Sequence, residues 1–284
     1  MTIINFPAHN DSFRKRAETM DEVSSGPRDV LVIVHRPESN PGRVGQWLRA
    51  NGYRLDIRCP RHGCPLPETL ENHAGAVIFG GPMSANDPDD YIKREIDWLA
   101  VPLRENKPFF GVCLGAQMLA KHLGSSVGFH PEKHVEVGYY PIRPTTAGRA
   151  LLAWPSHVYH WHCEGFGIPS GAECIVNGDM FENQAMRHGR AFGVQFHPEM
   201  TLAMIHRWTI SAAHRFSQPG ARPRVEHIAG YDAHGARTQD WLARFMTLWL
   251  APQESMADQQ TADHQKGRNP CPGFSVEAGA SASL

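Results

Sequence analysis

The sequence predicts an α/β protein in which helices cover both faces of a largely parallel central sheet. Three features predict this fold: apolar runs of strand length, amphipathic helical patterns between them, and glycines at the ends of two runs. Strand and helix patterns that alternate are typical of parallel sheets, because the crossover between two parallel strands is usually a helix. Such sheets bind ligands beyond the carboxyl ends of their strands.

Four strands are expected in the first half of the chain, at residues 30–35, 53–58, 76–79 and 108–112. The runs VLVIVH, AVIF and PFFGV are almost entirely apolar, which is typical of strands that are buried on both faces. YRLDIR alternates between polar and apolar residues, so we expect this strand nearer an edge of the sheet.

Three helical patterns are associated with these strands. They begin at Pro41, at Asp89 or Asp90, and after Cys113. Proline has no N–H and clashes with the preceding turn, so Pro102 should kink the second helix or end it early. Gly52 and Gly124 can close the first and third helices in a left-handed conformation.

The composition limits the partners and the location of the protein. The chain has 284 residues, and its 28 Lys and Arg nearly balance its 29 Asp and Glu, so its overall charge attracts neither nucleic acid nor an anionic membrane. It has no signal-peptide pattern and no apolar stretch near the ~20 residues that cross a bilayer. We therefore expect a cytoplasmic protein, and its six scattered cysteines without a CxxC pair should be reduced.

Three segments are expected along the chain. Residues 1–28 are mostly polar without a sustained period and are predicted to form an N-terminal arm. Residues 29–251 form the predicted domain. Residues 252–284 are rich in Gln, Ala, Ser, Gly and Pro, with too few apolar groups to offset the entropy of ordering, so we expect a disordered tail.

The stretch GVCLGAQ, residues 111–117, places Cys113 between two glycines where a strand pattern becomes a helix pattern. A sharp strand-to-helix turn of this kind exposes the central side chain, as in a nucleophile elbow. A small buried thiol is the alternative interpretation. Lowering a thiol pKa by two units from ~8.5 takes ~2.7 kcal/mol, whereas a helix N-terminus supplies ~0.3 to 1 kcal/mol. A catalytic Cys113 therefore requires a base.

The candidate base is His197 in AFGVQFHPE, residues 191–199. Apolar residues alternate up to Pro198, which ends the predicted strand and leaves His197 at its tip. Glu199 follows two residues later. A histidine can accept the thiol proton, and a carboxylate can fix the histidine tautomer and stabilise the imidazolium. The two stretches together predict a nucleophile and its base.

In combination, GVCLGAQ and GVQFHPE resemble the class I glutamine amidotransferases, nearest the domain that feeds ammonia to GMP synthetase. The resemblance covers residues 29–250 and implies a flavodoxin-like fold. It also implies that Cys113, His197 and Glu199 form the catalytic triad of the family.

Three further segments match the family, at Gly80-Gly81-Pro82, at Gln117 and at Glu136-Val137-Gly138-Tyr139. Gly80-Gly81-Pro82 resembles its oxyanion strand, which implies that the N–H groups of Gly81 and Leu114 bind the oxyanion. Each such donor is worth ~3 kcal/mol in the transition state. The substrate contacts implied by the resemblance are Gly80, Gln117, Val137, Gly138 and Tyr139.

The implied reaction hydrolyses the glutamine γ-carboxamide through a cysteinyl γ-glutamyl thioester and releases ammonia, with no metal or organic cofactor. The chain has no GxxxxGK(S/T) phosphate loop, so a separate synthetase subunit is the expected ammonia acceptor. A stand-alone γ-glutamyl peptide or amine hydrolase and a non-catalytic binding module are the alternatives. An α/β-hydrolase is disfavoured, because its acid precedes the histidine in the chain whereas Glu199 follows His197.

Two stretches have no role in this reaction. HVYHWHC, residues 157–163, sets His160 and His162 on one face of a predicted strand with Cys163 beside them. Zinc uses such ligands, yet a complete set requires a further partner from a distant part of the chain, so we predict no metal site. Residues 218–236 have no counterpart in the family pattern, and the sequence does not decide between a partner surface and a lid.

Overall fold

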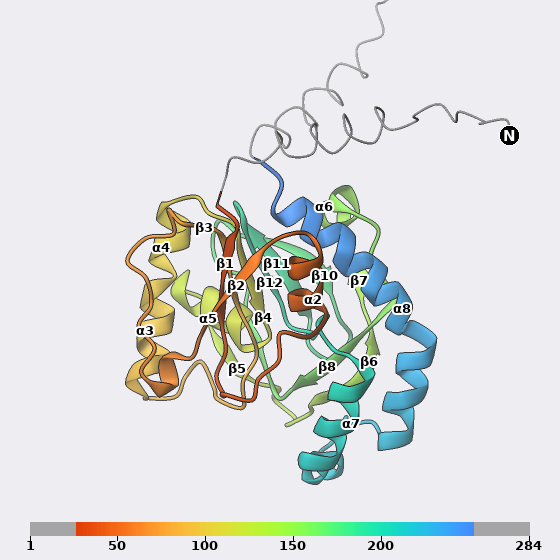
Figure 1. The fold of residues 1–284 in the computed structure, drawn as a ribbon. Coiled ribbons are helices and arrows are strands. Elements are labelled where there is room, and N and C mark those ends of the chain that lie inside the picture. Colours follow the sequence, from red (N-terminus) through yellow and green to blue (C-terminus); the bar gives the residue numbers. More distant parts are fainter. Residues whose placement is uncertain (1–26, 253–284) are drawn as a thin grey trace, which may run out of the picture. The chain divides into compact units, whose positions relative to one another are not determined.

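The computed structural model describes residues 27–252, so most of the expected arm (1–28) and tail (252–284) lies outside the described residues. Eight strands of the described part form one sheet (Figure 1). The strands follow one another across this sheet in the order β2 (Arg54–Arg58), β1 (Asp29–Ile33), β3 (His73–Ile78), β4 (Phe109–Val112), β12 (Ala191–Val194), β11 (Asn183–His188), β10 (Glu173–Asn177) and β7 (Arg143–Pro144).

The sheet is parallel from β2 to β12 and antiparallel from β12 to β7. The prediction of a largely parallel sheet is confirmed, and the alternating YRLDIR forms the edge strand β2. Strands β3, β4 and β12 are neighbours. The segments that follow them, at Gly80, Cys113 and His197, therefore meet at one edge of the sheet, where parallel α/β folds bind ligands.

The helices of the described part are α2 (Gly42–Ala50), α3 (Asp90–Trp98), α4 (Ala100–Arg104), α5 (Leu114–His122), α6 (Thr146–Leu151), α7 (Leu202–Ser211) and α8 (Arg224–Trp249), with 3-10 turns at Pro60–His62 and Ala213–Ser217. The three expected helical patterns become α2, the pair α3 and α4, and α5. The break at Leu99 confirms the expected effect of Pro102, whose ring clashes with the carbonyl four residues earlier.

Helices cover both faces of the sheet (Figure 1). Adjacent strand residues point to opposite faces, and Phe109 and Phe110 of β4 illustrate both sides. Phe109 belongs to a buried cluster with Leu119 of α5. Phe110 packs on Phe245 and Trp249 of α8, with ring centroids 4.7 and 6.0 Å apart. The helices α3, α4 and α5 thus lie on one face, and α8 lies on the other.

Two small sheets lie outside the main one. β5 (Val127–Phe129) pairs with β9 (Glu164–Phe166), and β6 (Glu136–Pro141) pairs with β8 (His157–His162), both antiparallel. The strand expected from HVYHWHC is therefore confirmed as β8. Its pairing with β6 brings residues about 25 positions apart in the chain into contact, with Glu136 opposite His162.

Residues 218–236 are mostly helical, because α8 begins at Arg224 and continues to Trp249. Two glycines lie inside this helix, and Gly230 has a packing role. A Cβ on Gly230 would lie 2.4 Å from the ring of Tyr139, so glycine lets α8 approach β6 closely. Packing of this kind overrides the low helix propensity of glycine.

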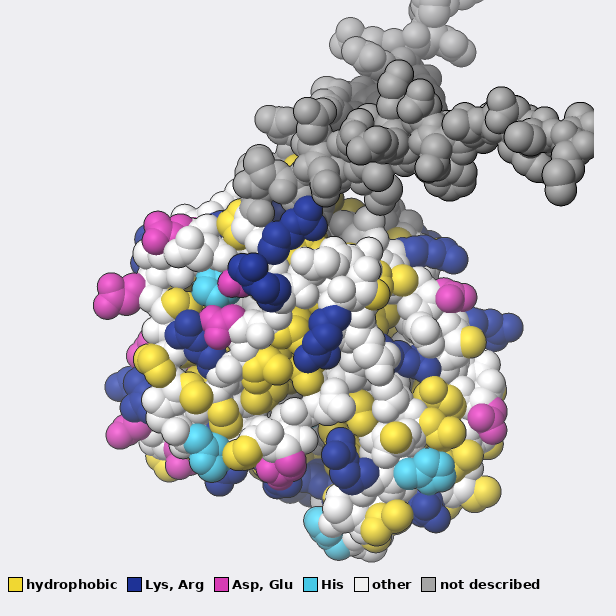
Figure 2. Space-filling view, viewed as in Figure 1, with side chains coloured by type: hydrophobic (Ala, Val, Ile, Leu, Met, Phe, Trp, Pro, Cys, Tyr) yellow, Lys and Arg dark blue, Asp and Glu magenta, His cyan; other side chains and the backbone are white. Residues whose placement is uncertain are grey.

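The surface agrees with the balanced composition. In the face shown in Figure 2, basic and acidic side chains are interspersed, without a large field of one sign. Within the described part of the chain, no helix has both the length and the apolar character needed to span a membrane.

Candidate active site

Cys113 lies at a sharp turn between β4 and α5. Its φ of 51° is unusual for a residue other than glycine, and its N–H donates to the Val194 carbonyl at 2.8 Å. The flanking glycines permit this turn. A Cβ on Gly111 would lie 2.5 Å from the Gly115 carbonyl, and one on Gly115 would lie 2.2 Å from the Ile78 carbonyl oxygen. The strand-to-helix turn expected from GVCLGAQ is therefore present.

His197 and Glu199 form a buried pair just beyond β12. The two residues are each 3% exposed, and His197 Nδ1 lies 2.8 Å from Glu199 Oε1. Burial lowers the pKa of His197, but the Glu199 carboxylate and the Cys113 sulfur favour the imidazolium and raise this pKa to about 10. The other ring nitrogen, Nε2, has no hydrogen-bond partner of good geometry among the described residues, so it is available to a reacting group.

The Gly80 backbone lies close to both the His197 ring and Cys113. A Cβ on Gly80 would lie 2.8 Å from Cε1 of His197 and 3.4 Å from Cβ of Cys113. The ring of Trp208 packs edge-to-face on His197, with centroids 5.1 Å apart. The imidazole is thus held between this tryptophan and the Gly80 backbone, next to the thiol.

The predicted oxyanion residues border the same space. Leu114 is the first residue of α5, so its N–H has no acceptor within the helix. Gly81 lines the cavity that holds Cys113. His35 holds this segment in place, because its Nδ1–H donates to the Gly80 carbonyl at 3.2 Å while Nε2 lies 2.9 Å from Glu95 Oε2. The sequence did not reveal this support.

A small cavity of about 40 Å³ reaches Cys113. It is lined by Gly81, Pro82, Met83, Cys113, Gln117, Trp161, His162, Cys163, Glu164 and Arg215. Space of this size holds little more than water, so a larger ligand requires side chains at its mouth to move. Arg215 is half-buried there and brings a positive charge to the cavity.

A chain of buried hydrogen bonds ends at the Cys113 sulfur. Gln195 Nε2 donates to this sulfur at 3.6 Å, and Gln195 Oε1 accepts from Gln117 Nε2 at 3.3 Å. Gln117 Nε2 also donates to the Glu164 carbonyl at 2.9 Å, which in turn accepts from His162 Nδ1–H at 3.0 Å. Gln117, which the resemblance implied as a substrate contact, lines the cavity, whereas Gln195 was missed. A polar residue inside the apolar strand pattern AFGVQF was the available signal.

Val137, Gly138 and Tyr139, which the resemblance implied as substrate contacts, do not line this cavity. They lie on β6, and the segment that precedes α8 covers them. The Val137 carbonyl accepts from the N–H of Arg222 at 2.9 Å, and a Cβ on Gly138 would lie 2.7 Å from the Arg222 side chain. The segment before α8, which has no counterpart in the family pattern, packs on the β6 backbone that was expected to face a substrate.

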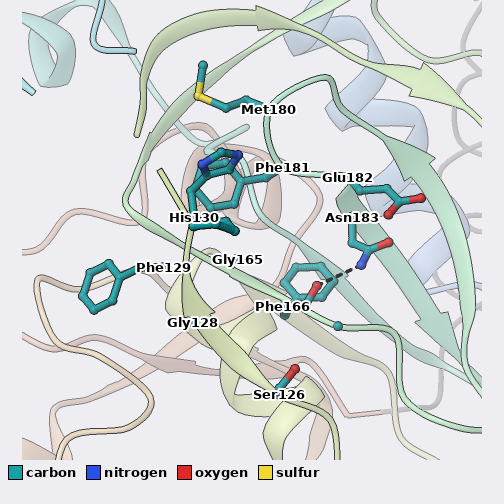
Figure 3. A pocket seen from close by; sticks show the side chains of 12 residues that line it. Ser126, Gly128, Phe129, His130, Gly165, Phe166, Met180, Phe181, Glu182 and Asn183 are labelled. Carbon is teal, nitrogen blue, oxygen red and sulfur yellow. Dashed lines mark hydrogen bonds between the residues drawn. The ribbon is translucent and has the colours of Figure 1, made fainter. Parts of the chain in front are cut away.

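A larger cavity of about 290 Å³ lies beside β5 and β9 (Figure 3). Phe129, His130, Phe166 and Phe181 are among the residues that line it. None of the predicted catalytic residues lines this space. The reactive groups gather at the smaller cavity instead, so we place the candidate active site there.

Comparison with known proteins agrees with this geometry. The family described as "Glutamine amidotransferase class-I" matches residues 43–207. A glutamine-hydrolyzing GMP synthase subunit from Thermococcus kodakarensis is 33% identical over 180 residues, which are 60% of this chain and 89% of that protein. The corresponding subunit from Methanococcus aeolicus is 28% identical over 181 residues, 61% of this chain and 89% of that protein.

A crystal structure of a glutamine amidotransferase from Methylobacillus flagellatus superposes with a TM-score of 0.74 at 26% identity, covering 79% of this chain and 95% of that one. The fold is thus the flavodoxin-like fold of glutamine amidotransferases. Because the family match spans more than half of the sequence, the chain belongs to the class I glutamine amidotransferase family.

Proposed function

We propose that this chain is a glutaminase that uses Cys113, His197 and Glu199 as its catalytic triad. One observation carries the proposal: a cysteine at a strained strand-to-helix turn lies against a histidine that a buried carboxylate keeps protonated. An imidazolium beside a thiol favours the thiolate, which is the reactive nucleophile. The resemblance of GVCLGAQ and GVQFHPE to the family motifs supports the same roles.

The proposed reaction begins with attack of the Cys113 thiolate on the γ-carbonyl carbon of glutamine. The N–H groups of Gly81 and Leu114 stabilise the oxyanion of the tetrahedral intermediate. His197 then gives its proton to the leaving nitrogen, and ammonia departs as the carbon–nitrogen bond breaks. Neutral His197 next takes a proton from water, the hydroxide attacks the thioester, and glutamate leaves with regeneration of the thiolate.

We propose that the ammonia is accepted by a separate synthetase subunit. The relatives from Thermococcus kodakarensis and Methanococcus aeolicus are each named as one subunit of a GMP synthase, which supports a division of the reaction between chains. The ammonia would then be formed on this chain and consumed on its partner.

The proposal is tested by incubating the purified chain with glutamine and measuring glutamate and ammonia. We expect turnover, in the presence of a copurified partner if not alone, and a trapped γ-glutamyl adduct on the peptide that contains Cys113. Cleavage of γ-glutamyl peptides but not of glutamine would replace this function with a stand-alone hydrolase. Failure to form an adduct with any γ-glutamyl compound would favour the non-catalytic binding module.

The variant Glu199→Gln is expected to move the alkaline limb of the pH profile for kcat/KM to lower pH by about 1 to 3 units. His197 must carry a proton to release ammonia, so activity is lost as pH rises through its pKa, which is about 10 in the wild type. Burial lowers this pKa, and the variant lacks the carboxylate that offsets burial. An unchanged alkaline limb would show that Glu199 does not control His197. Glu182→Gln, at an exposed glutamate that lines only the larger cavity, is the control variant.

A further inference from the structure

Three buried side chains converge beside the candidate active site without a role in the proposed proton transfers. Glu136 lies on β6, and His160 and His162 lie on the adjacent β8. All three are 3% exposed or less. His162 Nε2 lies 2.9 Å from Glu136 Oε2, while His160 Nδ1 lies 3.3 Å from the same oxygen and 3.2 Å from His162 Nε2. Glu136 is the distant partner that the sequence did not identify for the two histidines.

The hydrogen bonds around this cluster direct lone pairs toward its centre. His162 Nδ1–H donates to the Glu164 carbonyl at 3.0 Å, and a carbonyl only accepts, so the proton of neutral His162 is on Nδ1. Its Nε2 lone pair then faces a carboxylate oxygen, which is also an acceptor. The third atom, His160 Nδ1, adds another nitrogen to the same point. A single cation at this point would satisfy all three atoms at once.

The spacing of these atoms matches a zinc coordination sphere. A tetrahedral Zn²⁺ ion with bonds of about 2.0 Å keeps its ligand atoms about 3.3 Å apart. The three separations here are 2.9, 3.2 and 3.3 Å. We propose that Glu136, His160 and His162 bind a Zn²⁺ ion through these three atoms.

Contacts outside the cluster support the assignment. Histidines that bind metal usually donate their second ring N–H to a carbonyl or carboxylate, and His162 donates to the Glu164 carbonyl in this way. Carboxylate ligands are usually hydrogen-bonded as well, and Gln184 Nε2 donates to Glu136 Oε2 at 2.8 Å. Two histidines and a glutamate are a ligand set that leaves one coordination position for water.

The ion positions the wall of the active site and does not take part in thioester chemistry. His162 lines the cavity of Cys113, and the Glu164 carbonyl that it holds also accepts from Gln117 Nε2. An ion that joins β6 to β8 therefore fixes the start of the hydrogen-bond chain that ends at the Cys113 sulfur. Loss of the ion should loosen this wall.

A second group of potential ligands on the surface is less suitable. His130, Glu132 and His134 also bring three ligand atoms together. Glu132 is exposed, and His130 Nδ1 accepts from the N–H of Glu132 at 3.2 Å, which places the proton of neutral His130 on its other nitrogen. Metal binding through Nδ1 would need to break this hydrogen bond, and binding through Nε2 would need to move the proton. This group provides a matched control.

The test is the metal content and cobalt spectrum of the full chain purified without chelator. We expect about one Zn²⁺ per chain by mass spectrometry of the metal, and intense visible absorption of a tetrahedral site when the stripped protein is titrated with Co²⁺. His160→Gln should lose the zinc and the cobalt bands, whereas His134→Gln should keep both. The proposal would be overturned if the wild type held only background zinc and showed no cobalt bands. It would also be overturned if His160→Gln kept the bound zinc and the cobalt bands.

The wild-type measurements decide the question even if a variant folds poorly. Zn²⁺ added to the stripped wild type should raise Tm, because a ligand that binds only the folded state stabilises it. The same addition should leave the Tm of a folded His160→Gln or Glu136→Gln variant unchanged. An equal rise in Tm for these variants would assign the ion to another site. None of these readouts depends on glutamine turnover.

Discussion

Replacement of Cys113 by alanine is expected to lower ammonia release from glutamine by at least about 10,000-fold, because no thioester forms without the sulfur. The fold should remain intact. Alanine fills nearly the same space, meets no new restriction at a φ of 51°, and loses the hydrogen bond from Gln195 at 3.6 Å and the interaction with the His197 imidazolium. Glutamate production measures the loss of activity, and circular dichroism and Tm measure whether the fold is retained.

A second thiol in the same cavity provides a close control for this variant. Cys163 lines the cavity with Cys113, but burial raises the pKa of Cys163 and leaves its thiol protonated. Cys163→Ala should therefore retain turnover and the γ-glutamyl adduct. Full activity in Cys113→Ala, or loss of the adduct in Cys163→Ala alone, would show that the nucleophile is not Cys113.

Local motifs predicted the central part of the site because the backbone itself determines it. The glycines around Cys113 report a turn that other residues cannot enter. The expected strand up to Pro198 was too long, because β12 ends at Val194 and His197 follows it in the next segment. The parallel order of the sheet still brings the ends of β4 and β12 to one edge. Few long-range contacts are needed to foresee that arrangement.

The supporting residues depend on contacts between distant segments, which no local pattern encodes. Glu95 lies 60 positions from His35, and Gln195 lies 82 positions from Cys113. In the sequence Gln195 is a single polar position within an apolar pattern, and Glu95 is one of three consecutive charged residues in a helix. The length of α8 was also hidden, because Gly230 serves close packing against Tyr139 and not a turn.

The distance of Val137 and Gly138 from the lining of the cavity has a related cause. The segment at Val137 and Gly138 matches the family motif, but the segment ending at Arg222 covers it in this chain. A motif describes the strand and not the element that packs on it. Gln117 and Arg215 do line the Cys113 cavity.

Replacement of His197 by asparagine is expected to reduce turnover nearly as much as loss of the nucleophile, by about 1,000-fold or more. Asparagine can still donate a hydrogen bond to Glu199, so the buried carboxylate keeps a partner. It cannot hold the proton that stabilises the thiolate and that ammonia needs on departure. Glutamate production measures the loss, and Glu199→Gln should lose less, because the histidine remains.

Two readouts separate a catalytic role of His197 from a structural one. In the His197→Asn variant, the rate at which iodoacetamide alkylates Cys113 at neutral pH should fall by about tenfold or more relative to the wild type, since an unassisted thiol is only a few per cent thiolate. The double variant of Cys113→Ala with His197→Asn should be no slower than Cys113→Ala, because the two residues act as a unit. If the double variant lost activity additively and the alkylation rate did not change, the imidazolium would not support the thiolate, and the proposed triad would be wrong.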